Sequence, residues 1–349
     1  DSSYVPMNKG DYTSFMAKLS LNLGSIKIST MLNQNLSISR GYNHIYKYNP
    51  DGRSHSDGNT TLLMLQLNHF LNEKMFYDLK FSKTNNDYGS YVFEDYNSFN
   101  ILQEDGIYQG VYHFAGDTLY NYVNDKYMTA YGAGFFTGGQ DKGHLNRTTI
   151  TNNLKFDFTW QITNAHNIKT GFSRTAYELE NTYHTVRNAY AGTSDESDKY
   201  RPIVLPDSTV YSDVFFVEPK EMSFYIQDKF EKDEIVINYG LRYDAFDANT
   251  TYPSQRRNPI NSSTYYLKNS VGTDSLDANG NLIIDQSRMS YPIKSNIASQ
   301  ISPRFGFAYQ LGNVAVLHFS YGHFLQMPPM YAIYSNHSSI IGPSDYSTT

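Results

Sequence analysis

The sequence predicts an all-β protein whose strands form an antiparallel transmembrane β-barrel. Apolar and polar residues alternate along runs of about ten residues, the length with which a tilted strand crosses a membrane. The runs form pairs, with a short turn inside each pair and a long connection between pairs. Tyr accounts for 32 of the 349 residues, and aromatic residues together make up 15%. Membrane-spanning hairpins whose strands have one water-facing and one apolar face explain the alternation, the pairing of the runs and the high Tyr content.

The composition excludes several other classes of protein. Because the chain has no Cys, a disulfide scaffold, a thiolate metal site and a Cys nucleophile are excluded. The 28 basic and 34 acidic residues argue against a nucleic-acid partner, which would favour a basic excess. No stretch approaches the roughly 18 consecutive apolar residues of a membrane helix. The first residues show no signal segment in which a charged region precedes an apolar one.

Two hairpins are predicted in the first part of the chain, over about residues 12–38 and 61–83. Gly24-Ser25 interrupts the first alternation as a tight turn would, and Asn72-Glu73-Lys74 interrupts the second. The apolar residues of the first hairpin are Phe15, Ala17, Leu19, Leu21, Leu23, Ile26 and Ile28. Those of the second hairpin are Leu63, Leu65, Leu67, Met75, Tyr77, Leu79 and Phe81.

Three further hairpins are predicted over about residues 149–177, 222–246 and 303–325. Their turns fall near Ala165, Asp233 and Gly312, and apolar residues alternate with polar ones on both sides of each turn. The alternating apolar residues include Phe156, Phe158, Trp160, Ile168, Phe172, Phe224, Ile226, Ile237, Tyr239, Leu241, Phe305, Phe307, Leu317 and Phe319. The five hairpins give about ten strands.

The connections between hairpins are long, and the turns within hairpins are short. The long connections are expected at about 41–58, 85–146, 178–220, 247–302 and 326–349, without secondary structure of their own. An outer-membrane barrel has this asymmetry, with short periplasmic turns and long external loops. A soluble β-sandwich or barrel stays open as an alternative, because its strands also have one apolar face.

Two stretches show a family resemblance. Residues 223–246 read SFYIQDKFEKDEIVINYGLRYDAF, and residues 301–328 read ISPRFGFAYQLGNVAVLHFSYGHFLQMP. They contain the segments YIQD, NYGLRYD, SPRFG and SYG in that order. These segments resemble strands in the barrel of TonB-dependent outer-membrane receptors. In these sequence features the chain is most similar to the large receptors of Bacteroidetes-like bacteria that have a carboxypeptidase-regulatory-like N-terminal domain.

The resemblance implies energised import across a bacterial outer membrane. Receptors of this kind capture a ligand with external loops and pass it through a plugged barrel of about 22 strands. TonB–ExbB–ExbD supplies the energy and would act through an N-terminal part that is missing here. No TonB box or plug segment is visible before residue 11, so the chain is expected to be part of a longer receptor. A surface lipoprotein is a further candidate partner, and the lipid bilayer is the expected surroundings.

Aromatic residues in the longest loop, between 85 and 146, are the candidates for ligand binding. Tyr offers rigid, amphipathic contact area at low entropic cost, which suits the capture of a sugar, a peptide or a metal chelate. The alternative is that these rings hold the loop together and rest on the barrel rim. The candidate residues are Tyr108, Tyr112, Phe114, Tyr120 and Tyr122.

A candidate calcium loop lies between residues 274 and 285. Carboxylate and amide oxygens alternate there around Gly280, as oxygen ligands of Ca²⁺ do in loops. The spacing departs from the EF-hand pattern, so an ordinary turn rich in Asp and Asn is the alternative. The candidate ligands are Asp274, Asp277, Asn279 and Asp285. No other cofactor is expected.

Three classes of function follow from these residues. A receptor segment for TonB-energised uptake is favoured, and its ligand is open among ferric siderophores, cobalamin, glycans and peptides. A structural or adhesive barrel without transport is the first alternative. A ten-stranded outer-membrane protease is the second, with rim residues that include Asp95, Asp105, Asp117, His113 and His184. Because the strand segments resemble receptors, no enzyme activity and no catalytic residue are predicted.

Overall fold

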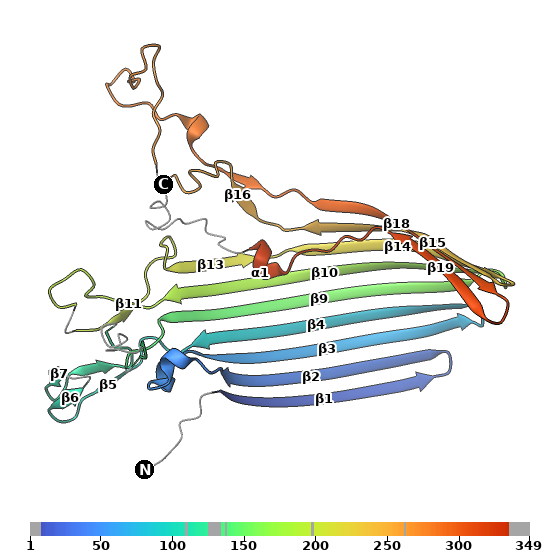
Figure 1. Ribbon diagram of the computed structural model, residues 1–349, viewed down its shortest axis with the longest axis horizontal. Helices are drawn as coiled ribbons and strands as arrows, with labels where there is room; N and C mark the ends of the chain where they lie inside the picture. Colours follow the sequence, from blue (N-terminus) through green and yellow to red (C-terminus); the bar gives the residue numbers. More distant parts are fainter. Residues whose placement is uncertain are drawn as a thin grey trace.

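The computed structural model describes residues 8–108, 111–124, 134–136, 138–196, 199–261 and 263–334. Within these residues, eleven strands form one antiparallel sheet that curves into a wall (Figure 1). The strand order along the wall is β1-β2-β3-β4-β9-β10-β14-β15-β18-β19, and β13 (Ser212–Val217) pairs with the far end of β10. Each long strand therefore lies beside the next long strand of the chain, as in a simple meander.

The structure has a strand pair at each of the five positions that the alternation indicates. The ten strands are β1 (Lys9–Leu23), β2 (Ile26–Arg40), β3 (His55–Asn72), β4 (Met75–Tyr91), β9 (Gly143–Gln161), β10 (His166–Thr185), β14 (Lys220–Lys232), β15 (Ile235–Asp247), β18 (Ala298–Leu311) and β19 (Ala315–Gly322). Most extend beyond the predicted limits at the end away from the turns. The extensions are mostly polar, and backbone pairing holds them: Asn86 of β4, for example, faces Thr149 of β9.

Two of the short turns that are only two residues long depend on a backbone conformation that few residues adopt. Gly24 has a φ of 62° and Asp233 has a φ of 50°. Glycine takes this left-handed conformation without strain, and Asp tolerates it better than most residues. These turns reverse the chain within two residues, since β2 begins at Ile26 and β15 begins at Ile235.

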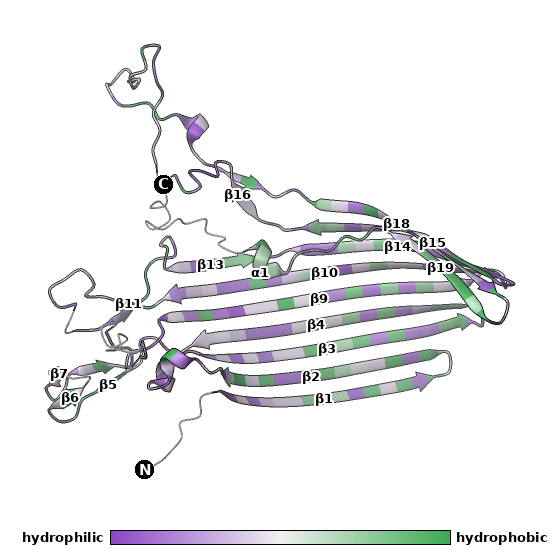
Figure 2. Ribbon diagram, in the orientation of Figure 1, coloured by the Kyte–Doolittle hydropathy of each residue, from purple (hydrophilic) through white to green (hydrophobic). Residues whose placement is uncertain are grey.

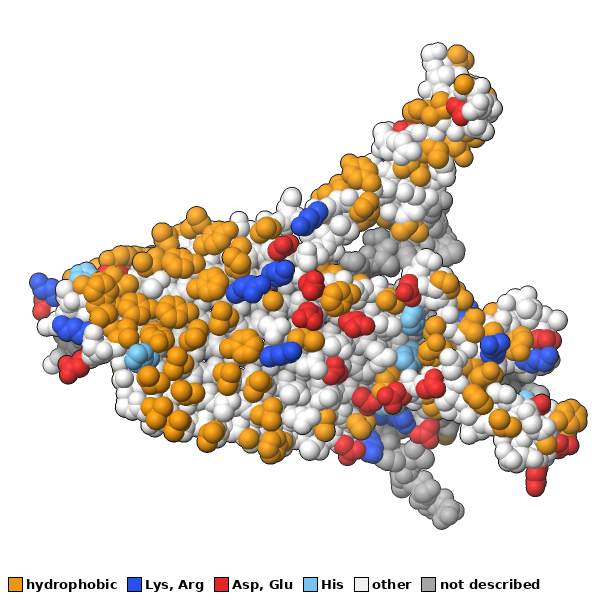
Figure 3. Space-filling view, turned by 180° about the vertical axis from the view of Figure 1, so that it is seen from behind, with side chains coloured by type: hydrophobic (Ala, Val, Ile, Leu, Met, Phe, Trp, Pro, Cys, Tyr) orange, Lys and Arg blue, Asp and Glu red, His pale blue; other side chains and the backbone are white. Residues whose placement is uncertain are grey.

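Apolar residues in register form continuous rows on one face of the wall. One row runs from β1 to β18 through Leu21, Ile28, Leu67, Leu79, Phe156, Phe172, Phe224, Tyr243 and Ile301. The hydrophobic side chains form a broad band on the half of this face that adjoins the turns (Figure 3). Such exposure is unfavourable in water and favourable against lipid chains, so this face is the outward one.

The opposite face of the same strands is polar. The equivalent row contains Asn22, Lys27, Asn68, Asp78, Asp157, Gly171, Tyr225, Arg242 and Ser302. The alternation along each strand is visible in the ribbon coloured by hydropathy (Figure 2). Because successive side chains of a strand point to opposite faces, the wall has an apolar outside and a wet inside.

The connections opposite the turns are more ordered than the sequence indicates, which corrects the expectation of loops without secondary structure. The β4–β9 connection contains β5 (Phe99–Ile101), β6 (Gly106–Tyr108), β7 (Val111–His113) and β8 (Thr118–Tyr120), paired β5–β8 and β6–β7. Other connections contain β11 (Arg187–Asn188), β12 (Pro202–Ile203), β16 (Thr251–Pro253) and β17 (Pro292–Lys294), and α1 (Met330–Ile333) follows β19. No described helix has the length and hydropathy of a membrane-crossing segment.

Candidate functional site

Three loops meet at the end of the wall away from the turns (Figure 1). They connect β2 to β3, β4 to β9 and β10 to β13. A buried cluster joins the last two: Val92 and Tyr122 from one loop pack with Val186 from the other, and Tyr122 is 1% exposed. The ammonium of Lys142 lies 5.1 Å from the centre of the Tyr122 ring. Burial raises the pKa of Tyr122 to about 12, because the phenolate would be poorly solvated there.

The β2–β3 loop is fastened to the β4–β9 loop through Asp141. Its carboxylate accepts hydrogen bonds from the hydroxyl of Tyr46 and, at 3.1 Å, from the backbone N–H of Ser54. The backbone N–H of Phe136 donates to the carbonyl of Ile45 at 2.8 Å. Burial, and then the nearby carboxylate, hold the pKa of Tyr46 above its usual range. The three loops therefore form one packed assembly.

The predicted ligand-binding aromatic residues occupy different environments in this assembly. Tyr112 and Phe114 are 56% and 64% exposed on the hairpin formed by β5 to β8, and their ring centres lie 5.5 Å apart. Tyr108 and Tyr120 are half-buried on the same hairpin. Tyr122 is buried in the cluster with Val92 and Val186, so it supports the loops and offers no contact surface.

The β2–β3 loop carries a second exposed aromatic surface, which was not among the residues predicted to bind a ligand. Tyr42 and Tyr48 are 51% and 61% exposed, and the rings of Tyr48 and His44 both make edge contacts with Phe135. The hydroxyl of Tyr42 lies 2.7 Å from Nδ1 of His44. The signal was present in the segment GYNHIYKYNP, in which aromatic residues recur at close spacing. Two surfaces with exposed aromatic rings thus border the loop assembly.

The candidate calcium ligands do not converge. Asp277 accepts from the backbone N–H groups of Asn279 and Asn281, both at 2.8 Å, and these bonds lower its pKa. Asp274 forms an ion pair with Lys268, and Asp285 accepts from the backbone N–H of Ser287. In the described ranges, no group of three or more His, Cys, Asp or Glu residues could hold a metal ion. The segment is a turn stabilised by its own Asp and Asn side chains.

The residues of the protease alternative also have separate structural roles. His113 lies 3.5 Å from the carboxylate of Asp117, near the tip of the exposed hairpin. Asp105 accepts from the backbone N–H of Ala115, and Asp95 accepts from that of Asn97. His184 lies on β10, and its Nδ1 is 3.0 Å from the hydroxyl of Ser212. A hairpin tip and a strand end do not supply the shared cleft that an Asp–His catalytic pair needs.

The inner face of the wall carries a network of charged and aromatic groups. The guanidinium of Arg242 donates to both carboxylate oxygens of Asp244, at 2.8 and 2.9 Å. Asp157 accepts from the hydroxyl of Tyr225 at 2.7 Å and pairs with Lys155 at 2.8 Å. These contacts give the inner face a polar lining in which the charged groups have partners.

The segment that follows β19 turns back across the inner face. Tyr334, which is 1% exposed, packs with Leu179 and Val217 and donates its hydroxyl hydrogen to the carbonyl of Ala248 at 2.5 Å. A cavity of about 370 Å³ lies between β14, β15 and residues 325–327. Glu221, Arg242 and Asp244 line it. The inner face therefore offers a polar, partly covered surface below the loop assembly.

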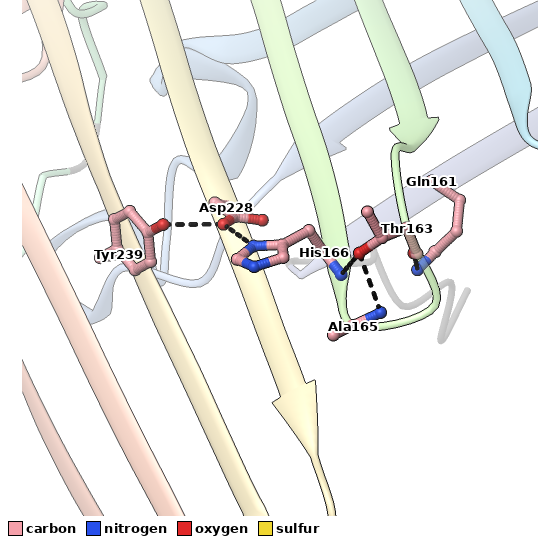
Figure 4. A network of polar contacts seen from close by, with 6 residues as sticks. All are labelled: Gln161, Thr163, Ala165, His166, Asp228 and Tyr239. Carbon is pink, nitrogen blue, oxygen red and sulfur yellow. Dashed lines mark hydrogen bonds and ion pairs between the residues drawn. The ribbon is translucent and has the colours of Figure 1, made fainter.

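A separate polar network lies near the turn end of the wall (Figure 4). The carboxylate of Asp228 on β14 lies 2.7 Å from Nδ1 of His166 and accepts from the hydroxyl of Tyr239 at 2.8 Å. The hydroxyl oxygen of Thr163 accepts from the backbone N–H groups of Ala165 and His166 and shapes the β9–β10 turn. Asp228 is in register with Ile168, so it lies on the outward face. Both partners contact the same oxygen of this carboxylate, Oδ2, at the edge of the apolar band.

Comparisons with known proteins agree with this architecture. A family model described as "Outer membrane beta barrel domain" matches residues 14–348. Three solved structures share the fold: the copper transporter OprC (TM-score 0.54, 10% identity), the Serratia marcescens hemophore receptor HasR in complex with HasA and heme (0.51, 11%), and the ferric citrate transporter FecA (0.50, 9%). None of the curated protein sequences matches the chain.

The matches cover most of this chain and a smaller part of each relative. They include 93%, 91% and 90% of the chain but only 39%, 37% and 36% of OprC, HasR and FecA. At these identities the likeness shows the fold alone. The three relatives are described as transporters or as a receptor, and none of the three as an enzyme.

Proposed function

Because the chain belongs to the outer membrane beta barrel domain family, we propose that it supplies barrel wall and external loops to a receptor for TonB-energised uptake. The chain lies in the bacterial outer membrane, with its outward apolar face against the lipid. The single observation that carries the proposal is the likeness of this wall to OprC, HasR and FecA over at least 90% of the chain. Those three proteins handle copper, a hemophore with heme, and ferric citrate.

The proposed role begins with capture of the ligand at the external loops. The exposed rings of Tyr42, Tyr48, Tyr112 and Phe114 border an assembly that buried packing holds in place. A rigid surface loses less entropy on binding than a mobile one, so preorganised loops favour affinity. The ligand then passes along the polar inner face, where Arg242 and Glu221 lie beside the covered cavity.

The proposal also requires parts that complete the barrel. Among the described strands, β1 and β19 each pair with the sheet on one side only. Further strands would close the wall into a barrel of about 22 strands, the size that holds a plug. The plug and its contact with TonB–ExbB–ExbD would couple transport to energy from the inner membrane. A surface lipoprotein that covers the loops is a further proposed partner.

Uptake in whole cells tests the proposal. The full receptor would be expressed in cells with and without TonB, and each strain would be given labelled ferric citrate, heme, cobalamin, an oligosaccharide and a peptide. We expect one probe to accumulate only when both the receptor and TonB are present. Accumulation that is equal without TonB would remove the energised step. Failure of every probe to exceed the receptor-free background would favour a structural or adhesive barrel.

A further inference from the structure

Three basic residues lie together on the outward face, at the loop-side edge of the apolar band. They are Lys83 on β4, Arg174 on β10 and Lys220 on β14, and we call them the basic patch. The register places them on this face, because Lys83 is opposite Leu63 and Arg174 is opposite both Leu154 and Met222. Basic and acidic side chains lie next to one another at this edge of the band in Figure 3, and further acidic ones lie toward the loops.

The register also fixes the spacing within the basic patch. Lys83, Asn152, Ala176 and Lys220 form one row across four adjacent strands, and Arg174 lies two residues from Ala176 along β10. Adjacent strands are about 4.8 Å apart, and two residues along a strand span about 6.7 Å. The three backbone positions therefore fall within about 15 Å of one another. An extended lipid headgroup could contact all three side chains.

None of the three basic groups forms an ion pair or hydrogen bond with a side chain of the described residues, and each is exposed. Asp247 lies opposite Lys220 in the register, but its carboxylate accepts from the backbone N–H of Asn249. On the inner face, by contrast, Lys229 pairs with Glu231 at 2.5 Å. Glu178 shares this face two residues from Ala176 along β10, so the three basic groups exceed the two neighbouring carboxylates, Asp247 and Glu178, by one positive charge.

We propose that the basic patch binds phosphate groups in the headgroups of outer-leaflet lipids. Short turns mark the periplasmic side of such a wall, so the loop-side edge of the apolar band faces the outer leaflet. At that edge, the aliphatic parts of Lys and Arg lie along the apolar surface while their charged ends reach the headgroups. Phosphate is the anion found at this height, and the planar guanidinium of Arg174 can bind two of its oxygens. The contact fixes the depth at which the receptor lies in the membrane. This anchoring role is separate from uptake itself.

Native mass spectrometry of the full receptor tests the proposal. The probes are a glycolipid with two phosphate monoesters and its dephosphorylated form, each added to the receptor in neutral detergent. The test variant is Lys83→Gln/Arg174→Gln/Lys220→Gln. The matched control, Lys80→Gln/Lys169→Gln/Lys229→Gln, changes three lysines on the inner face of the same three strands. Each basic residue at an anionic lipid surface contributes about a factor of five in affinity, so the test variant should bind the phosphorylated probe about a hundredfold more weakly.

The outcomes separate the proposal from its alternatives. The control should bind as the unmodified receptor does, and the charge-retaining variant Lys83→Arg/Lys220→Arg should keep its affinity. If the test variant does not fold, the single variant Arg174→Gln gives the same comparison with a smaller effect, about fivefold. Equal binding of the two probes, or equal losses in the test and control variants, would overturn the proposal.

Discussion

Tyr225 on β14 reaches across the intervening strand β10 to donate its hydroxyl hydrogen to Asp157 on β9, at 2.7 Å. The crossing is possible because Gly171 of β10 lies between them and has no side chain. A Cβ atom at position 171 would lie 2.4 Å from the Tyr225 ring and 2.7 Å from the Asp157 carboxylate. The glycine thus lets the aromatic ring pass close over the backbone of β10 and link β14 to β9.

Gly171→Ala is therefore expected to destabilise the wall. Either the Tyr225 ring or the backbone must move, and overpacking of this kind costs about 1–3 kcal/mol. The measurement is the thermal unfolding of the full receptor in detergent. Gly306→Ala is the control, since a Cβ there would meet its nearest neighbour at an ordinary 3.7 Å. Equal melting temperatures for the two variants would show that the crossing does not depend on the glycine.

Alternation in the sequence predicts the hairpins because the two faces of the wall meet different solvents. Alternation does not predict the loop-side ends of the strands, because both faces of the wall contact water there and apolar residues no longer alternate with polar ones. Residues 84–87 of β4 are polar throughout, and only pairing with β9 shows that they continue the strand. The role of Asp277 is also invisible in the sequence, because its carboxylate accepts hydrogen bonds from two backbone N–H groups of its own turn.

Tyr122 could not be distinguished from Tyr112 by sequence, because its burial depends on Val186, which is distant in the chain. The structure predicts different results for the two residues. Tyr122→Ala removes a ring from the centre of the loop assembly and should destabilise it by about 3 kcal/mol. Limited proteolysis of the external loops on intact cells should become faster. Tyr112→Ala, at an exposed position, should leave the rate unchanged, and faster cleavage in both variants would contradict the assignment.

The raised pKa of Tyr122 also predicts a dependence on pH. The folded state holds the proton up to a pKa of about 12, whereas a free tyrosine loses it near 10. The stability contributed by the neutral ring is therefore complete below about pH 10 and is lost as the pH rises toward 12. The tyrosinate absorbance of the receptor minus that of Tyr122→Phe should develop with a midpoint near 12. A midpoint near 10 would mean that the ring is not buried.

The network at Asp228 predicts a stability change at the turn end of the wall. Asp228→Ala leaves the Tyr239 hydroxyl and the His166 ring without their acceptor, which should cost about 1–3 kcal/mol. Glu231→Ala is the control, because its exposed ion pair with Lys229 contributes about 1 kcal/mol or less. Chemical unfolding of the full receptor in detergent compares them. A loss in Glu231→Ala as large as that in Asp228→Ala would contradict the role of the network.

Single-cysteine labelling on intact cells tests most directly the claim that the wall crosses the outer membrane with its loops outside. The chain has no Cys, so Phe114→Cys and Asn164→Cys each introduce one reactive site, on an exposed loop and on a short turn. A membrane-impermeant maleimide should label Phe114→Cys in intact cells and Asn164→Cys only after the outer membrane is opened. Labelling of Asn164→Cys in intact cells, with protection of Phe114→Cys, would contradict the orientation and the receptor function proposed from it.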